Sequence, residues 1–405
     1  MVYNIEEVIL IEIIMTYNFD EIVDRRNTGA IKLERRKALY GSENVLPLWV
    51  ADMDFRTPDF IFEAIRERCE HPILGYSMPP KEFYPLLINW IKDHHQWEVN
   101  RSWVGFLPGI VPGLSFAVQS LTVPGDEVIV QPPVYYPFFH VVTNNNRVVI
   151  NNPLKEIHGK YEMDFDDLER KITPKTKLFI LCNPHNPGGR VWSAETLKQL
   201  ADICTKHNII VVSDEIHADM VLGDHKHIPF ATVSESAALI SLTFMAPSKT
   251  FNMPGLISSS YIIPNEKLRK QFVDFLEASE LTGGNIFAYA ATVAAYKKGE
   301  DWRQQMLTYV QGNIDFVVDF LKTNIPQIKP MIPEASFLVW LNCEDLGMET
   351  DELFDFFAKK AGLGLNKGTT FGQGGEYHLR LNVACSRLIL KKAMEQLSKA
   401  VNGRV

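Results

Sequence analysis

Residues 177–217 read KLFILCNPHNPGGRVWSAETLKQLADICTKHNIIVVSDEIH, and this stretch decides the fold. Two short apolar runs, 177–182 and 209–212, flank a segment in which apolar residues recur at helical spacing and Ser193 stands at the N-cap position. Apolar strands separated by a helix are typical of a parallel sheet covered on both faces. The sequence therefore predicts an α/β fold with a mostly parallel central sheet.

Three chemical groups follow predicted strands and should share one edge of this sheet. Asn186 follows the first run, Asp214 follows the second, and Lys249 follows a third apolar run, 237–244, which we expect to be a strand leading into a loop. Ligands of parallel sheets gather at the carboxyl ends of the strands. A lysine in an apolar pocket has a lowered pKa and its neutral amine attacks carbonyls, although most lysines are simply solvated. The shared edge is what makes Lys249 a candidate.

A second candidate site lies in LPGIVPGL (107–114), just before a predicted helix that extends to Leu121. Proline favours the first helical turn, so Pro112 marks the helix start. The free N–H groups of Ile110 and Val111 would form an anion site that the helix dipole strengthens. A plain helix cap explains the same pattern, and the spacing of the glycines is weak evidence alone.

Length and composition bound the class of protein. A chain of 405 residues predicts two domains, and we expect an N-terminal extension (1–15), an arm with part of a small domain (16–58), a large domain (59–300) and a small α+β domain (301–405). The formal net charge of −8 and the dispersed basic residues argue against nucleic acid as a partner. The apolar run 8–14 is too short to span a membrane.

The cysteines and acidic pairs give further expectations. Five dispersed cysteines with no close pair indicate reduced thiols in a cytoplasmic protein. Asp52 and Asp54 could bind a metal, but no histidine or third carboxylate lies nearby in the sequence. A turn capped by these aspartates before Pro58 explains them better, so we expect no metal site.

Five motifs resemble one known family. They are LPLWVADMDF (46–55), CNPHNPGGRVW (182–192), VVSDEIHADM (211–220), APSKTFNMPGL (246–256) and GGEYHLRLNVACSR (374–387). Their order and spacing resemble the fold-type I pyridoxal-phosphate (PLP) enzymes of the class I/II aminotransferase superfamily, and most of all the C–S lyases of the MalY/PatB type. The resemblance extends from about residue 17 to residue 401.

The resemblance implies roles around PLP for residues on the sheet edge. It makes Lys249 the covalent anchor of PLP and the group that moves the Cα proton, and it pairs Asp214 with the pyridine nitrogen. Asn186 would bind the phenolic oxygen, with His217 supporting the same edge. Tyr135 would join Lys249 in the catalytic centre by stacking on the cofactor ring. Without the family, His217 and Tyr135 would be interpreted as packed structural residues.

The resemblance also implies which residues bind the charged groups of the cofactor and the substrate. The phosphate would be bound by Ile110, Val111 and Ser248, together with Tyr76 from a neighbouring subunit. The contribution of Tyr76 implies a homodimer with shared active sites. Arg380 would clamp the substrate carboxylate, since its planar fork forms two hydrogen bonds. Many aminotransferases carry a further arginine eight residues after the lysine, and Ile257 stands there instead.

The family implies a chemistry but the shared residues leave the reaction open. The leading hypothesis is a C–S β-lyase of methionine and sulfur amino acid metabolism, which releases a thiol, pyruvate and ammonia from cystathionine or related S-substituted cysteines. An aminotransferase on the same scaffold would share the first proton transfer and need a 2-oxo acid. A regulatory or partner-binding protein that retains the fold is a third hypothesis, although no DNA-binding module is apparent.

Overall fold

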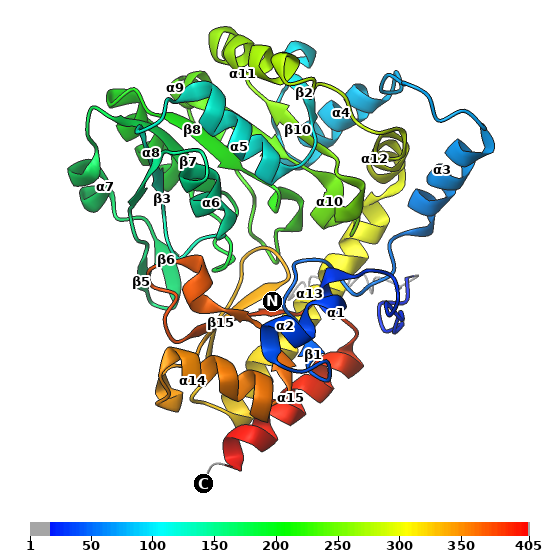
Figure 1. Cartoon of the computed structure of the whole chain (residues 1–405), viewed down its shortest axis with the longest axis vertical. Helices are drawn as coiled ribbons and strands as arrows, with labels where there is room; N and C mark the ends of the chain where they lie inside the picture. The colour runs from blue at the N-terminus through cyan, green and yellow to red at the C-terminus, as the bar shows by residue number, and fades with distance from the viewer. Residues whose placement is uncertain (1–16, 404–405) are drawn as a thin grey trace, which may run out of the picture.

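A computed structural model describes residues 17–403, and its two larger sheets are of different kinds (Figure 1). A seven-stranded sheet carries helices on both faces, and a four-stranded sheet lies with the C-terminal helices. The predicted extension, residues 1–15, falls outside the described residues. The division of the chain at residues 58 and 300 stays a prediction. No helix in the described part of the chain is both long and apolar enough to cross a membrane.

The large sheet is mostly parallel, as the sequence predicted. Its order is β2-β10-β9-β8-β7-β3-β4, and only β10 runs against its neighbours. The register of β7 and β8 sets Cys182 beside Asp214, so both strands end at one level. The strands are β2 (Val104–Leu107), β3 (Glu127–Val130), β4 (Val148–Asn151), β7 (Thr176–Cys182), β8 (Ile210–Asp214), β9 (Ser241–Met245) and β10 (Ser259–Ile262).

Alternate residues of these strands enter two different cores. Leu178 and Ile180 of β7 belong to the core that includes side chains of α5, α6 and α11, while Phe179 and Leu181 belong to the core under α7, α8 and α9. Burial on both faces is why the strands are near-continuous apolar runs. The helices are α5 (Ile110–Leu121), α6 (Pro137–Thr143), α7 (Phe165–Lys171), α8 (Ala194–Lys206), α9 (Glu235–Ile240) and α11 (Glu266–Ala278).

Two predicted elements are wrong in detail. Residues 237–240 of the expected strand form the end of α9, because Ser234 caps that helix by accepting a hydrogen bond from the Ala237 N–H at 3.1 Å. The sequence also predicts one long helix over residues 285–323, but these residues form two helices, α12 (Ile286–Lys298) and α13 (Glu300–Asn324), which meet at Gly299. A Cβ on Gly299 would lie 2.2 Å from the Phe251 ring, so only glycine fits at this junction.

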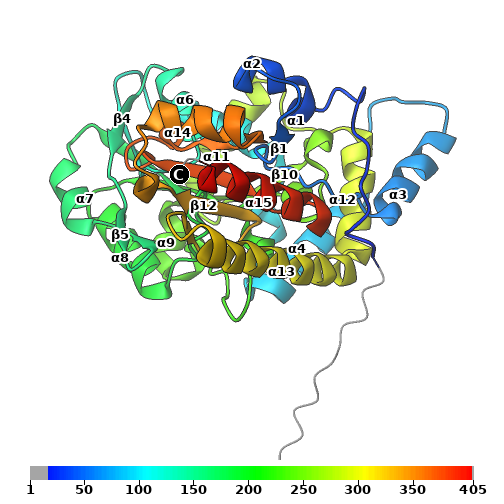
Figure 2. The same cartoon turned by 90° about the horizontal axis from the view of Figure 1, so that it is seen from below.

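The second sheet is antiparallel, with the order β11-β12-β15-β14. It shares one core with α13 and α15, which lie side by side (Figure 2). The N-terminal arm joins this part of the molecule, because β1 pairs in parallel with β13. The elements are β1 (Leu46–Pro47), β11 (Lys329–Met331), β12 (Leu338–Asn342), β13 (Leu363–Gly364), β14 (Asn366–Lys367), β15 (His378–Asn382), α14 (Thr350–Asp355), a π-helix (Phe356–Lys360) and α15 (Arg387–Asn402).

The remaining elements lie around the edge of the large sheet. The arm before β1 forms two short helices, and a long irregular segment, residues 71–80, joins α3 to α4. Both α3 and α4 pack against α12. These elements are α1 (Ile31–Glu34), α2 (Arg36–Tyr40), α3 (Asp59–Glu70), α4 (Phe83–His95), α10 (Pro247–Thr250) and the hairpin of β5 (Lys155–Ile157) and β6 (Lys160–Glu162).

Candidate active site

Lys249 lies at the carboxyl edge of the large sheet, directly after β9. It belongs to the one-turn helix α10 rather than to the expected loop, because Pro247 occupies the first helical position. The Nζ atom donates a hydrogen bond of 2.5 Å to the carbonyl oxygen of Ala51. Burial, helped by the Arg380 guanidinium, lowers the pKa of Lys249 to about 8 against the opposing effects of Asp52 and Asp214. Near neutral pH a useful fraction of this amine is therefore uncharged and nucleophilic.

Asp214 ends β8, one strand away from Lys249. Its Oδ1 atom accepts a hydrogen bond of 3.1 Å from the Ile216 N–H, and the side chain is buried. Burial raises the pKa of this carboxyl to about 7, in part against the attraction of Lys249. Burial therefore favours the neutral carboxylic acid of Asp214, and a cation placed beside it would favour the ionised form.

This burial predicts a stability effect in the ligand-free protein. The folded-state pKa of Asp214 lies above that of an unfolded aspartate, so ionisation opposes folding as the pH rises towards and through 7. We expect Asp214→Asn to raise the free energy of unfolding by about 2–4 kcal/mol at pH 8 and by less at pH 5. Denaturant unfolding at both pH values measures the difference, with the exposed-pair variant Asp274→Asn as the control. An equal change in the free energy of unfolding at the two pH values would contradict a raised pKa for the buried Asp214 carboxyl.

Arg380 connects the second sheet to this edge. From β15 its guanidinium donates to Asn186 Oδ1 at 2.9 Å and to Asn366 Oδ1 at 2.7 Å, with a longer bond of 3.2 Å to the Trp49 carbonyl. The guanidinium lies over the Phe371 ring, 4.9 Å from its centroid. Its Nε atom is buried without a hydrogen-bond partner, and burial lowers its pKa to about 10. A buried cation with a spare donor is suited to bind an anionic ligand.

His217 and Tyr135 complete the surroundings of the lysine. The Nδ1 atom of His217 is buried and has no partner, and burial together with Lys249 and Arg380 lowers the His217 pKa to about 3, so the ring is neutral. Tyr135 is half-buried in the segment before α6, with its ring 5.3 Å from that of Tyr136. Burial raises the pKa of Tyr135, so its hydroxyl keeps its proton.

The start of α5 faces the same edge. β2 and β9 both pair with β10, through Leu107 with Ser259 and Met245 with Ser260, so α5 and α10 begin at the same level of the sheet. The helix begins at Ile110, two residues before the expected Pro112, and Gly109 precedes it with φ +135°, a conformation restricted to glycine. The N–H groups of Ile110 and Val111 occupy the first turn, where helices leave donors free. Ser248 lies buried in α10.

Tyr76 is a predicted site residue that the structure does not bring to Lys249 within one copy of the chain. It is fully exposed in the 71–80 segment, and Ile257, at the position of the missing arginine, is half exposed with φ +53°.

The structure also places residues around Lys249 that were not predicted from the sequence. Ala51 contacts Lys249 through its backbone, and Asp52 and Asp54 form ion pairs with Arg25 and Lys32 instead of capping a turn. Within residues 17–403 no group of three or more His, Cys, Asp or Glu side chains could hold a metal ion.

Comparison with known proteins assigns the family. The model of the family described as aminotransferase class I and II matches residues 43–397. The chain belongs to the class I and II aminotransferase family. The resemblance seen in the five motifs is thereby confirmed, and so is the fold class. Among family members, cystathionine beta-lyase PatB of Bacillus subtilis is 45% identical over 95% of this chain and all of its own length.

Solved structures of the family match the whole architecture. The PLP-bound putative aminotransferase of Clostridium difficile 630 has a TM-score of 0.93 and 42% identity over 95% of this chain and all of that chain. The PLP-bound C–S lyase of Staphylococcus hominis has a TM-score of 0.89 and 36% identity over 96% of this chain and 99% of that chain. Both relatives carry PLP, which makes the fit of this cofactor to the present site the next question.

Proposed function

We propose that this protein is a PLP-dependent C–S β-lyase that cleaves cystathionine or a related S-substituted cysteine to a thiol, pyruvate and ammonia. The observation that carries the proposal is the buried amine of Lys249, with a pKa of about 8, which interacts electrostatically with the carboxyl of Asp214 and the guanidinium of Arg380. The relatives called cystathionine beta-lyase and C–S lyase support the choice of reaction. The free cysteines are compatible with a cytoplasmic enzyme of sulfur amino acid metabolism.

The residues of the site fit PLP. Lys249 would hold the cofactor covalently, and Asp214 would ionise beside a protonated pyridine nitrogen, which removes the cost of its burial. Asn186 and the unpartnered His217 Nδ1 supply polar atoms along one edge, and Tyr135 offers a ring for stacking. The first turn of α5, with Ser248, suits the phosphate. When bound, PLP supplies an electron sink for the negative charge that develops at the substrate Cα.

The protein's own groups would then carry the reaction. Arg380 binds and orients the substrate carboxylate with the donors that now contact Asn186, Asn366 and Trp49. Lys249, once free, removes the Cα proton, and its lowered pKa matches that task near neutral pH. The buried walls of the site limit access of water to the reacting carbon.

A second candidate, an aminotransferase, is favoured by the likeness to the Clostridium difficile protein. Both reactions begin with removal of the Cα proton, so the lysine does not separate them. The test is to incubate the purified protein with cystathionine, without any 2-oxo acid, and to follow pyruvate and free thiol. We expect product well above a Lys249→Ala control. Product that appears only after addition of a 2-oxo acid would overturn the lyase in favour of the aminotransferase.

We also propose a homodimer in which Tyr76 of one copy reaches the phosphate site of the other. The 71–80 segment exposes Ile73, Leu74, Tyr76 and Met78, each by 66% or more. An apolar cavity of about 680 Å³ opens beside Lys249 between α3 and residues 252–256. Contiguous exposed apolar side chains mark interaction surfaces, and the proposed occupant of this surface is a second copy of the chain.

Leu74→Asp tests the dimer. A charge on a buried interface carries a penalty of several kcal/mol, so we expect a shift from dimer to monomer in sedimentation and a loss of most lyase activity. Leu388→Asp, which changes an equally exposed leucine in the first turn of α15, should leave both unchanged. A monomeric wild-type protein, or a Leu74→Asp protein that stays dimeric and active, would contradict the proposal.

A further inference from the structure

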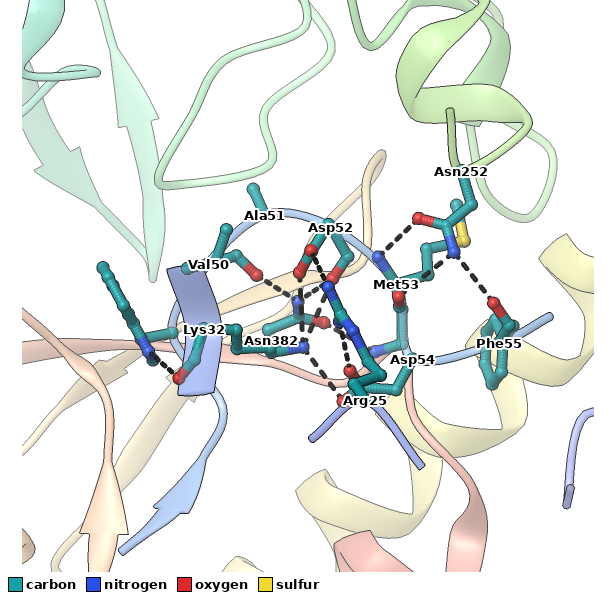
Figure 3. A network of polar contacts seen from close by, with 12 residues as sticks. Arg25, Lys32, Val50, Ala51, Asp52, Met53, Asp54, Phe55, Asn252 and Asn382 are labelled. Atoms are coloured by element: carbon teal, nitrogen blue, oxygen red, sulfur yellow. Dashed lines mark hydrogen bonds and ion pairs between the residues drawn. The ribbon is translucent and has the colours of Figure 1, made fainter. Parts of the chain in front are cut away.

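Residues 49–55, which we call the strap, cross the site beside Lys249 and are held at almost every residue. Asn382 on β15 donates to the Val50 and Asp52 carbonyls at 2.6 and 2.8 Å. Asn252, after α10, accepts from the Met53 N–H at 3.0 Å and donates to the carbonyls of Met53 and Phe55 at 3.1 and 2.8 Å. The strap is therefore held by the second sheet on one side and by the turn after α10 on the other, and Ala51 lies between the two residues that Asn382 binds (Figure 3).

The carboxylates of the strap are bound by two cations from the N-terminal arm (Figure 3). Arg25 donates to Asp52 at 2.5 Å and to Asp54 at 2.8 Å. Lys32 lies 2.9 Å from Asp54 and 3.6 Å from Asp52, and its side chain is only 1% exposed. Two positive and two negative charges thus form one compact cluster, in which each cation bridges both carboxylates.

We propose that Arg25 and Lys32 are positioning residues that fix the strap so that the Ala51 carbonyl receives the Lys249 amine whenever that amine is free. The inference rests on the proposed role of Lys249 and makes the N-terminal arm part of the catalytic site. An amine that leaves the cofactor would otherwise rotate among several conformations. Because the Ala51 carbonyl accepts a hydrogen bond from the free amine, it holds the amine in one orientation. From that orientation the amine can approach the Cα proton.

The cluster also sets the electrostatic field at Lys249. The charged groups that face this amine are Arg380 from β15, Asp214 from β8 and Asp52 from the strap, with neutral His217 after β8. Asp52 favours the protonated amine, and Arg25 and Lys32 neutralise part of that effect. Removal of Arg25 and removal of the Asp52 charge should therefore change the protonation of the lysine nitrogen in opposite directions.

The experiment measures the midpoint of the pH titration of the visible absorption band in purified holoenzyme, together with kcat and KM. We expect Arg25→Met to raise this midpoint and Asp52→Asn to lower it, each by about 0.5 to 1 pH unit. Both variants should lower kcat by about 10-fold or more, with a smaller change in KM. Arg25→Lys should restore the midpoint, because it returns the charge.

The matched control is Arg26→Met. Arg26 is the neighbouring arm residue, and within residues 17–403 its side chain pairs only with Asp24, on the surface. The midpoint and kcat of this variant should therefore equal those of the wild type. Unshifted midpoints, or shifts of the same sign in Arg25→Met and Asp52→Asn, would overturn the inference. If the wild type binds PLP but lacks lyase activity, the proposed reaction fails, while the opposite shifts still test the cluster.

Discussion

Lys249→Ala should lower the rate of cystathionine cleavage by more than about 10³-fold, since a positioned general base contributes 10²–10⁴-fold and this lysine would also anchor the cofactor. The amine lies buried with its Nζ 2.5 Å from the Ala51 carbonyl, and alanine leaves no other amine that the structure places against this carbonyl. The measurement is pyruvate release at saturating cystathionine, with the visible absorption band of the purified protein recorded in parallel. The band should be lost with the activity.

The control is a lysine with the same charge and no contact with the site. Lys270 on α11 is exposed and pairs with Asp274, so Lys270→Ala should retain the wild-type rate and absorption. A Lys249→Ala protein that keeps more than a tenth of the wild-type rate would remove this lysine from the mechanism. If Lys249→Ala keeps the absorption band without added amine, Lys249 is not the covalent anchor of PLP.

The sheet edge was predictable from the sequence because strand burial and ligand position obey local rules. The apolar runs 177–182 and 209–212 predicted β7 and β8, and the structure places Asp214 at the end of β8 and Asn186 after β7, both at the expected edge. Arg380 could be placed only through the resemblance. It lies on a strand of the other sheet and meets Asn186 across 194 residues of chain, a contact that no local pattern predicts.

Other features were out of reach for physical reasons. The acceptor for Lys249 is a backbone carbonyl, which carries no side-chain signature, and the partners of Asp52 and Asp54 lie 20 to 29 residues earlier in the arm. The aspartates were therefore interpreted as local caps. Residues 237–240 were misassigned because a short apolar run fits a buried helix as well as a strand, and the cap at Ser234 decided between them.

Arg380→Lys should lower kcat/KM for cystathionine by about 10²-fold or more, mainly through KM. Lysine keeps the charge but is a point donor, whereas the guanidinium fork can bind both oxygens of a carboxylate at once. Weakening one partner of a buried, hydrogen-bonded charge pair costs about 2–5 kcal/mol. The contacts to Asn186 and Asn366 would weaken as well, because the shorter ammonium cannot reach both amides with the same geometry.

Arg387→Lys is the matched control for this substitution. Arg387 also bonds an asparagine, Asn313, at 2.7 Å and lies over a ring, that of Phe316, at 5.0 Å, but it does so at the start of α15, away from Lys249. A loss of packing common to both arginines would therefore appear in both variants as a lower melting temperature with little change in KM. A rise in KM confined to Arg380→Lys identifies the carboxylate clamp, because only that guanidinium carries a buried unpartnered Nε beside the lysine that reacts. An unchanged KM in Arg380→Lys would assign the substrate carboxylate to another cation.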